Sequence, residues 1–182
     1  LFHDGTPLDA EAVKYNFDRM LNPDFASIRK TGLGTLTAVE APDAKTLEFS
    51  FSAPYAPFFT NLYGNGISSP AAIELHGDAY GHDPGGSGAY TFKSWDLGQS
   101  VSLERNPDFV QRRADYNHPG PARVETLTWK IIRESATRNA ALLAGELDIA
   151  GVDLTQAESV QNNDDFEVYI WKDRNGFIFI EY

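Results

Sequence analysis

The sequence predicts a mixed α/β fold, because segments with helical and strand periodicity alternate along its 182 residues. Apolar residues between 12 and 21 recur with a helical period, whereas those of 46–52 alternate with polar residues as in a half-buried strand. Hydrophobic residues make up 42% and charged residues 23%, which favours a folded chain over a disordered one. The length suits one domain or two small lobes.

The first helix is expected to begin after Asp9 and to end at Leu21. Asp9 can cap the helix, and Glu11 places an acid in the first turn, where the helix dipole favours negative charge. Pro23 ends the helix, since proline disfavours helical geometry in the residue before it.

The remaining elements follow in chain order, after a loop over 24–34. Strands are expected over about 35–41, 46–52, 89–95, 100–105, 123–133, 147–150, 166–171 and 177–182, with an extended piece at 67–69. Short helices are expected over about 54–63, 70–75, 135–143 and 155–162. We expect Ser135 to cap the third of these and Gly145 to stop it. The glycine-rich segment 77–88 is the best candidate for a boundary between lobes.

Charge and composition exclude several classes of function. Twenty-six acids against fifteen bases give a net charge of −11, which argues against a nucleic-acid backbone or an anionic membrane as the main partner. Cysteine is absent, so disulfides, thiolate metal sites and cysteine nucleophiles are excluded. No apolar run approaches the roughly 18 residues that span a bilayer. The chain starts at Leu1 and stops within an apolar run, so we expect a fragment without its signal peptide.

Two polar clusters invite a catalytic or metal-binding interpretation. His76, Asp78, His82 and Asp83 carry groups that ligate zinc or nickel, but their spacing fits no strong metal motif, and solvated loop residues are the preferred interpretation. Segment 85–88 (GGSG) resembles a phosphate-binding loop or a nucleophile elbow, yet a strand follows it where both motifs require a helix. We therefore assign no catalytic residue, no metal ligand and no cofactor.

The aromatic residues beside a glycine-containing turn are more informative. Tyr55, Phe58, Phe59 and Tyr63 fall on an expected short helix that ends at Gly64. Aromatic side chains next to a flexible loop commonly line ligand pockets. Packing in the core is at least as good an interpretation for the two phenylalanines. Tyr63, at the end of the helix, is the better candidate for ligand contact.

Four segments, in order along the chain, together resemble one family. FHDGTPLDAEAV at 2–13 is similar to the F-x-DGTPLTAEDV signature of the solute-binding proteins of oligopeptide, dipeptide and nickel ABC transporters. HDPGGSGAYTF at 82–92 looks like the NPVGTGPYKF of that family, with Ser87 for Thr and Ala89 for Pro. LERNPDF at 103–109 and RNAALLAGELDI at 138–149 match its later motifs. Each motif alone is weak, but four in family order are specific.

The resemblance implies a partial fold of the type II periplasmic-binding-protein class. Family members have two lobes that close on a ligand. By this pattern residues 1–80 form an insertion subdomain of the first lobe, and residues 81–182 form part of the α/β sheet of that lobe. The second lobe is then absent from the chain, and we expect the chain alone to bind ligand weakly or not at all.

The function implied by the resemblance is the binding component of an ABC importer. It captures a small solute, with a peptide as the first expectation and a metal chelate as another, and delivers it to a membrane permease. The expected location is outside the cytoplasm, in the periplasm or tethered by lipid. Two alternatives stay open: a sensing module of the same fold that does not transport, and, more remotely, a metal-dependent hydrolase built on residues 76–83.

The family pattern also indicates which residues contact ligand. The loop after the first helix and the segment before 67–70 supply cleft-facing side chains in related proteins. These positions correspond to Arg29, Tyr63 and Asn65. The planar guanidinium of Arg29 is suited to a carboxylate, such as a peptide C-terminus or part of a metal chelate. A solvated loop arginine is an equally weighted alternative.

Overall fold

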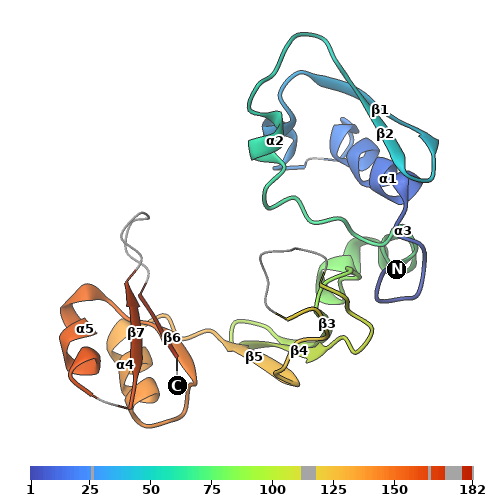
Figure 1. The fold of residues 1–182 in the computed structure, drawn as a ribbon. Coiled ribbons are helices and arrows are strands. Elements are labelled where there is room, and N and C mark those ends of the chain that lie inside the picture. The colour runs from blue at the N-terminus through green and yellow to red at the C-terminus, as the bar shows by residue number, and fades with distance from the viewer. Residues whose placement is uncertain (26, 112–117, 164, 171–177, 182) are drawn as a thin grey trace. The chain divides into compact units, whose positions relative to one another are not determined.

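A computed structural model describes residues 1–25, 27–111, 118–163, 165–170 and 178–181 (Figure 1). The chain divides into two compact units, which we describe separately. Unit 1 contains Leu1–Asp96 and Val101–Trp129, and unit 2 contains Leu97–Ser100 and Lys130–Tyr182. The assignment of residues 1–80 and 81–182 to parts of the first lobe refers to the complete two-lobed protein, so it stays a prediction. No helix in the described ranges is both long and apolar enough to cross a membrane.

Unit 1 combines three helices with two small sheets. Its elements are α1 (Ala10–Leu21), β1 (Leu36–Asp43), β2 (Thr46–Phe51), α2 (Phe58–Asn61), α3 (Pro70–His76), β3 (Tyr90–Asp96), β4 (Ser100–Arg105) and β5 (Thr126–Lys130), with 3-10 turns at Lys30–Leu33 and Gly77–His82. Strands β1 and β2 form an antiparallel hairpin in which Val39 lies opposite Phe49. The second sheet has the order β3-β4-β5, and its ends at Ser100 and Lys130 fall in unit 2.

Unit 2 packs two helices on a three-stranded sheet. Its elements are α4 (Ser135–Leu143), β6 (Ile149–Gly151), α5 (Leu154–Gln161), β7 (Glu167–Ile170) and β8 (Ile178–Glu181), and the antiparallel sheet has the order β6-β8-β7. Leu142 and Val160 are fully buried in its core. Arg138 of α4 donates from Nε to the Gly151 carbonyl at 2.6 Å and from Nη1 to the Ile132 carbonyl at 2.8 Å, so it ties α4 to β6.

The mixed α/β class is confirmed, and most elements lie where the sequence predicts them. Helix α1 begins after Asp9, whose Oδ1 accepts a hydrogen bond from the Ala12 amide at 3.0 Å, and it ends before Asn22. The expected strand at 147–150 and helix at 155–162 correspond to β6 and α5. The segment 172–176, which joins the expected strands at 166–171 and 177–182, lies outside the described residues.

Three expectations were wrong in detail. Helix α2 has one turn instead of covering 54–63, and it begins only after Pro57, its N-cap residue. Strand β5 is shorter than 123–133. Glu134, not Ser135, is the N-cap of α4, since the Ser135 hydroxyl donates to Gln156 Oε1 at 3.1 Å instead of capping.

The core of unit 1 is a cluster of aromatic rings around Phe58 of α2. The Phe58 ring meets Phe51 edge-on at 4.9 Å and Phe49 at 5.2 Å between centroids, and Phe49 in turn meets Phe17 of α1 at 5.2 Å. Phe17 and Phe58 are each only 3% exposed. Edge-to-face pairs of this kind add about 0.5–1.5 kcal/mol each to the burial of the rings. The cluster therefore binds α1, β2 and α2 into one body.

A buried asparagine links α1 to the segment before α3. Asn16 is 8% exposed, and its Nδ2 donates to the carbonyls of Ala12 and Ser68, both at 2.8 Å. Its Oδ1 accepts from the Ser68 amide at 3.0 Å. The side chain thus pairs with both backbone groups of Ser68, as a neighbouring strand would, and fixes the chain at that residue.

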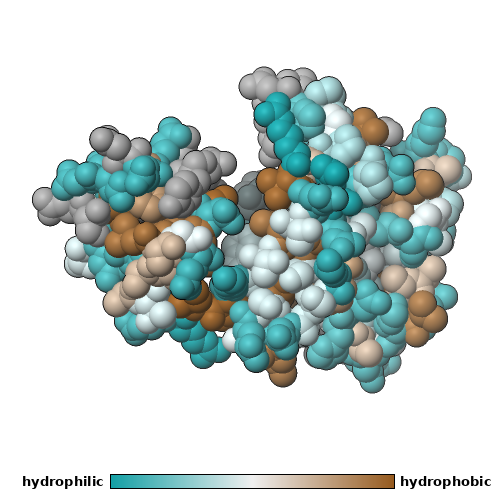
Figure 2. Space-filling model, turned by 90° about the horizontal axis from the view of Figure 1, so that it is seen from below, coloured by the Kyte–Doolittle hydropathy of each residue, from teal (hydrophilic) through white to brown (hydrophobic). Residues whose placement is uncertain are grey.

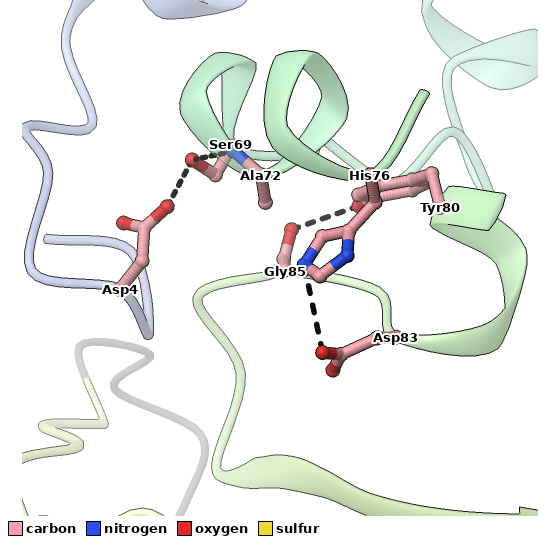
Figure 3. Close-up of polar contacts among 7 residues, drawn as sticks. All are labelled: Asp4, Ser69, Ala72, His76, Tyr80, Asp83 and Gly85. Atoms are coloured by element: carbon pink, nitrogen blue, oxygen red, sulfur yellow. Dashed lines mark hydrogen bonds and ion pairs between the residues drawn. The ribbon is translucent and has the colours of Figure 1, made fainter. Parts of the chain in front are cut away.

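The N-terminal turn joins α3 through Asp4 and Ser69 (Figure 3). Asp4 Oδ2 accepts a hydrogen bond from the hydroxyl of Ser69, a residue that is completely buried. Asp4 Oδ1 accepts from the Thr6 amide at 2.9 Å and from the Thr6 hydroxyl at 2.6 Å. Ser69 Oγ also accepts from the Ala72 amide at 3.3 Å and so caps α3. The DGTP segment of the sequence motif therefore has a structural role.

The glycine-rich segment 77–88 contacts Ser69 as well. The Gly85 carbonyl accepts from the Ser69 amide at 3.0 Å and from the Tyr80 hydroxyl at 2.9 Å (Figure 3). A Cβ atom on Gly85 would lie 2.7 Å from the Cβ of Ala72, which is closer than real Cβ contacts allow. A side chain at this position would push the segment away from α3.

We expect Gly85→Ala to lower the free energy of unfolding by about 1–3 kcal/mol, because an extra carbon in a closed contact forces the backbone apart. Gly81→Ala is the matched control, since a Cβ at Gly81 meets nothing within 4 Å. Urea unfolding of both variants measures the difference. Equal stability of the two would contradict the close contact at Gly85.

Asp4 also makes stability depend on pH. Burial raises the pKa of Asp4, but the hydrogen bonds from Ser69 and Thr6 outweigh it and hold that pKa below its ordinary value of 3.8. A lowered pKa in the folded state stabilises the fold above pH 3.8, and this stabilisation is lost as the pH falls through the folded-state pKa. We expect Asp4→Asn to destabilise the protein at pH 7 and to lose its effect towards pH 3.

The measurement is the unfolding free energy of wild type and Asp4→Asn at several pH values between 7 and 3. Asp108→Asn serves as the control, because the Asp108 carboxylate makes no hydrogen bond to another described residue. A difference for Asp4→Asn that stayed constant with pH would show that its hydrogen bonds do not favour the ionised form.

Candidate functional site

Arg29 and the turn around Gly64 lie next to each other in unit 1, although 35 residues separate them in the sequence. Arg29 immediately precedes the 3-10 turn Lys30–Leu33, and a Cβ placed on Gly64 would lie 3.8 Å from Arg29 Nη1. One nitrogen of the guanidinium therefore lies near Gly64, the residue that stands between Tyr63 and Asn65 in the sequence. The structure thus brings the three residues predicted from the sequence into one neighbourhood.

The three residues differ in what they offer to a ligand. The Arg29 side chain is exposed, and Tyr63 is 83% exposed. Asn65 is half-buried, and its Nδ2 donates to the Asn61 carbonyl at 3.4 Å. Gly64 has a φ of +83°, a left-handed conformation that glycine adopts without strain. Arg29 and Tyr63 are therefore presented outward, whereas Asn65 also holds the turn together.

Asn61, the last residue of α2, positions the two loops against each other. Its Nδ2 donates to the Gly32 carbonyl at 3.1 Å and to the Tyr55 hydroxyl at 2.9 Å. A Cβ on Gly34 would lie 2.4 Å from the Tyr55 ring, and Gly34 has a φ of +59°. Tyr55 can pack against the loop only because glycine stands there. These contacts fix the 3-10 turn that begins after Arg29.

The local charge at this site is opposite to that of the whole chain. Residues 19–33 hold three bases (Arg19, Arg29 and Lys30) against one acid (Asp24), a local balance of 3 − 1 = +2, and residues 53–66 hold no charged residue. None of the ion pairs between described residues includes Arg29. Lys30 donates to the Leu21 carbonyl at 3.0 Å, and Arg19 lies over the Phe25 ring at 3.9 Å. Arg29 is therefore the cation most available to an anion.

The molecule is otherwise acidic, and polar residues cover much of the face drawn in Figure 2. A shallow hollow of about 290 Å³ lies elsewhere in unit 1, beside the start of α1. It is lined by Thr6, Pro7, Asp9, Glu11, Ala12, Tyr15, Pro70 and Ala71. Two of its lining residues are acidic, which disfavours an anionic ligand, and it contains none of the three predicted residues.

The histidine cluster separates into two unrelated contacts. His76 Nε2 lies 3.5 Å from Asp83 Oδ2 (Figure 3), whereas the His82 ring stacks on Trp95 at 5.0 Å between centroids. Within the described ranges, no three His, Cys, Asp or Glu side chains gather as they would around a metal ion.

Sequence reasoning missed Asn61 and named Tyr55 only among the aromatic residues of the expected short helix. Both residues act through partners in the 29–34 loop, and an asparagine or tyrosine near a helix end carries no local signal of such contacts. A glycine at position 34, just before a predicted strand, was the one available hint of a close approach. Of the two phenylalanines for which core packing was one interpretation, Phe58 lies in the core, whereas Phe59 is 81% exposed.

Comparison with known proteins identifies the fold and the relatives. Residues 1–182 match the middle region of the bacterial extracellular solute-binding proteins, family 5. The chain is 39% identical over 162 residues to the probable D,D-dipeptide-binding periplasmic protein DdpA of Escherichia coli K12, covering 82% of this chain and 28% of the relative. It is 31% identical over 166 residues to the glutathione-binding protein GsiB of Pectobacterium atrosepticum, covering 90% and 31%.

Solved structures show the same fold. NikZ of Campylobacter jejuni in complex with Ni(L-His) matches with a TM-score of 0.81 at 24% identity, covering 93% of this chain and 33% of that one. The oligopeptide-binding protein AppA of Bacillus subtilis in complex with a nonapeptide matches with a TM-score of 0.79 at 24% identity, covering 93% and 34%. The chain thus spans about a third of the length of these proteins. The expected partial fold is confirmed.

We expect Asn61→Ala to lower the free energy of unfolding by about 1–3 kcal/mol, because the Gly32 carbonyl and the Tyr55 hydroxyl lose a common donor. Thr60→Ala, an exposed change on the same helix turn, should alter stability by less than about 0.5 kcal/mol. Chemical denaturation measures both values. Similar small effects of the two substitutions would show that Asn61 does not hold the loops.

Proposed function

Since the chain belongs to family 5 of the bacterial extracellular solute-binding proteins, we propose that it forms part of the binding component of an ABC importer. The complete protein captures a small solute by closing two lobes around it and hands the solute to a membrane permease. A peptide is the expected ligand, and a metal chelate is the alternative. The protein works outside the cytoplasmic membrane, in the periplasm or tethered by lipid, and catalyses no reaction.

The observation that carries this proposal is the guanidinium of Arg29. It stands beside Gly64 on a locally positive surface, and no carboxylate among the described residues pairs with it. A guanidinium can donate two parallel hydrogen bonds to a carboxylate, which gives both binding energy and orientation. Arg29 therefore binds an anionic group of the ligand, with Tyr63 and Asn65 beside it.

The ligands named for relatives support the same chemistry. They include a D,D-dipeptide, glutathione, a nonapeptide and a nickel–histidine complex. Peptides, glutathione and histidine each carry at least one carboxylate. An arginine that recognises a carboxylate would serve all of them, so this feature supports the ligand class and leaves the particular solute open.

Closure of the two lobes explains how ligand binding can be communicated to the permease without a chemical reaction. A ligand that contacts both lobes binds the closed form more tightly than the open form and so shifts the population towards closure. In this proposal Arg29 and Tyr63 supply contacts from the first lobe. The hydrolase alternative has no comparable support, because His76 and His82 contact different partners. No observation favours a sensing role over transport.

We expect Arg29→Gln in the complete natural chain to weaken binding of a carboxylate ligand about tenfold or more, because a hydrogen bond to a charged group contributes about 1.5–3 kcal/mol. Arg29→Lys should retain part of the affinity. Titration calorimetry with dipeptides and tripeptides, and with their C-terminal amides, measures the effect.

Lys45→Gln is the control for loss of one positive charge, since Lys45 lies in the β1–β2 turn of the same unit. The fold should tolerate Arg29→Gln, because the side chain makes no hydrogen bond to another described residue. Affinity that is unchanged in Arg29→Gln, or equal for the free acid and the amide, would refute the carboxylate role.

A further inference from the structure

The two most exposed large apolar side chains of the described residues flank the proposed carboxylate site. Ile28 is 87% exposed and directly precedes Arg29. Tyr63 is 83% exposed and directly precedes Gly64, next to which the Arg29 guanidinium lies. Phe59, four residues before Tyr63, is 81% exposed. Single exposed apolar residues need no explanation, but two of them that directly precede Arg29 and Gly64 in the sequence do.

Hydrogen bonds hold the backbone at Ile28 and at Tyr63. The Ile28 carbonyl accepts from the Thr31 hydroxyl at 3.3 Å, which ties Ile28 to the 3-10 turn. The Tyr63 amide donates to the Thr60 carbonyl at 3.2 Å and so continues the turn of α2. Consecutive Cα atoms lie about 3.8 Å apart. The Ile28 side chain is therefore attached close to Arg29, and the Tyr63 side chain close to Gly64.

We propose that this surface binds the carboxylate end of an amphiphilic ligand. The guanidinium of Arg29 binds the carboxylate, and Ile28 and Tyr63 contact an apolar side chain next to that carboxylate. The inference rests on the proposed function and deepens it, because it names the ligand class. The site prefers a peptide that ends in a leucine-like residue over one that ends in glycine or aspartate.

The preference follows from the chemistry of the last residue of the peptide, which is leucine, glycine or aspartate. A leucine side chain placed against Ile28 and Tyr63 removes apolar surface of both partners from water. Glycine offers no such surface. A second carboxylate placed there would lose water without gaining a charged partner, because neither Ile28 nor Tyr63 carries a positive charge.

The experiment compares tripeptides that differ only in the last residue, Ala-Ala-Leu, Ala-Ala-Gly and Ala-Ala-Asp, together with the C-terminal amide of Ala-Ala-Leu. Calorimetry on the complete natural chain gives the four affinities. We expect Ala-Ala-Leu to bind at least about tenfold more tightly than Ala-Ala-Gly, and Ala-Ala-Asp to bind most weakly of the three acids.

Variants separate direct contact from indirect effects. Ile28→Ser and Tyr63→Ser should each reduce the ratio of leucine to glycine affinity at least about threefold. Leu75→Ser is the matched control, because Leu75 is 78% exposed on α3 of the same unit. It should leave the ratio unchanged. Thermal unfolding verifies that all three variants are folded.

The outcomes distinguish the two proposals. Equal affinity for the leucine and glycine peptides, with the amide bound more weakly than the acid, would overturn the amphiphile inference and leave the Arg29 role standing. Equal affinity for acid and amide would overturn that role, and no binding of any of these peptides would overturn both this inference and the peptide ligand expected in the proposed function, leaving the metal chelate. If the serine variants lower the stability of the ligand-free protein and leave the affinity ratio unchanged, another part of the protein covers Ile28 and Tyr63, and the inference is wrong.

Discussion

The buried ring of Phe58 is the contact on which the candidate site depends. Helix α2 has only one turn, too short to be stable on its own, since helix nucleation is unfavourable. The edge-to-face contacts of Phe58 with Phe49 and Phe51 attach this turn to β2. Asn61 at its end then reaches the 3-10 turn after Arg29, and Tyr63 follows two residues later. The placement of the candidate site residues is thus a consequence of core packing.

Local patterns predicted the parts of the fold that local forces determine. The alternation of Leu47, Phe49 and Phe51 defines β2, and Asp9 caps α1 within its own turn. Ser135 shows the limit of this reasoning, because its hydroxyl bonds to Gln156 on α5, a partner that no sequence window around 135 contains. The length of α2 was overestimated for a related reason, since apolar periodicity does not reveal where the chain leaves the core.

The sequence predicted the candidate site as a set of residues, and that prediction stays one, but it gave no arrangement for them. Resemblance to a family pointed to Arg29, Tyr63 and Asn65, whereas only the structure shows that Arg29 lies near Gly64 across 35 positions. The motif that carried the resemblance at the N-terminus proved to be structural: Asp4 accepts the hydrogen bond of buried Ser69. A recurring sequence motif can therefore stabilise the fold and still identify the family correctly.

The segment that carries Tyr63 and Asn65 is held at both ends. Tyr55 and Asn61 fix its start, and Asn16 pairs with both backbone groups of Ser68 at its end. Most of the conformational entropy of this loop is therefore lost during folding, before any solute arrives. Under the proposed function, a solute would meet a surface that is already ordered, so its binding would require no induced ordering of this loop. Selectivity at the candidate site would then come from shape and charge that exist in the free protein.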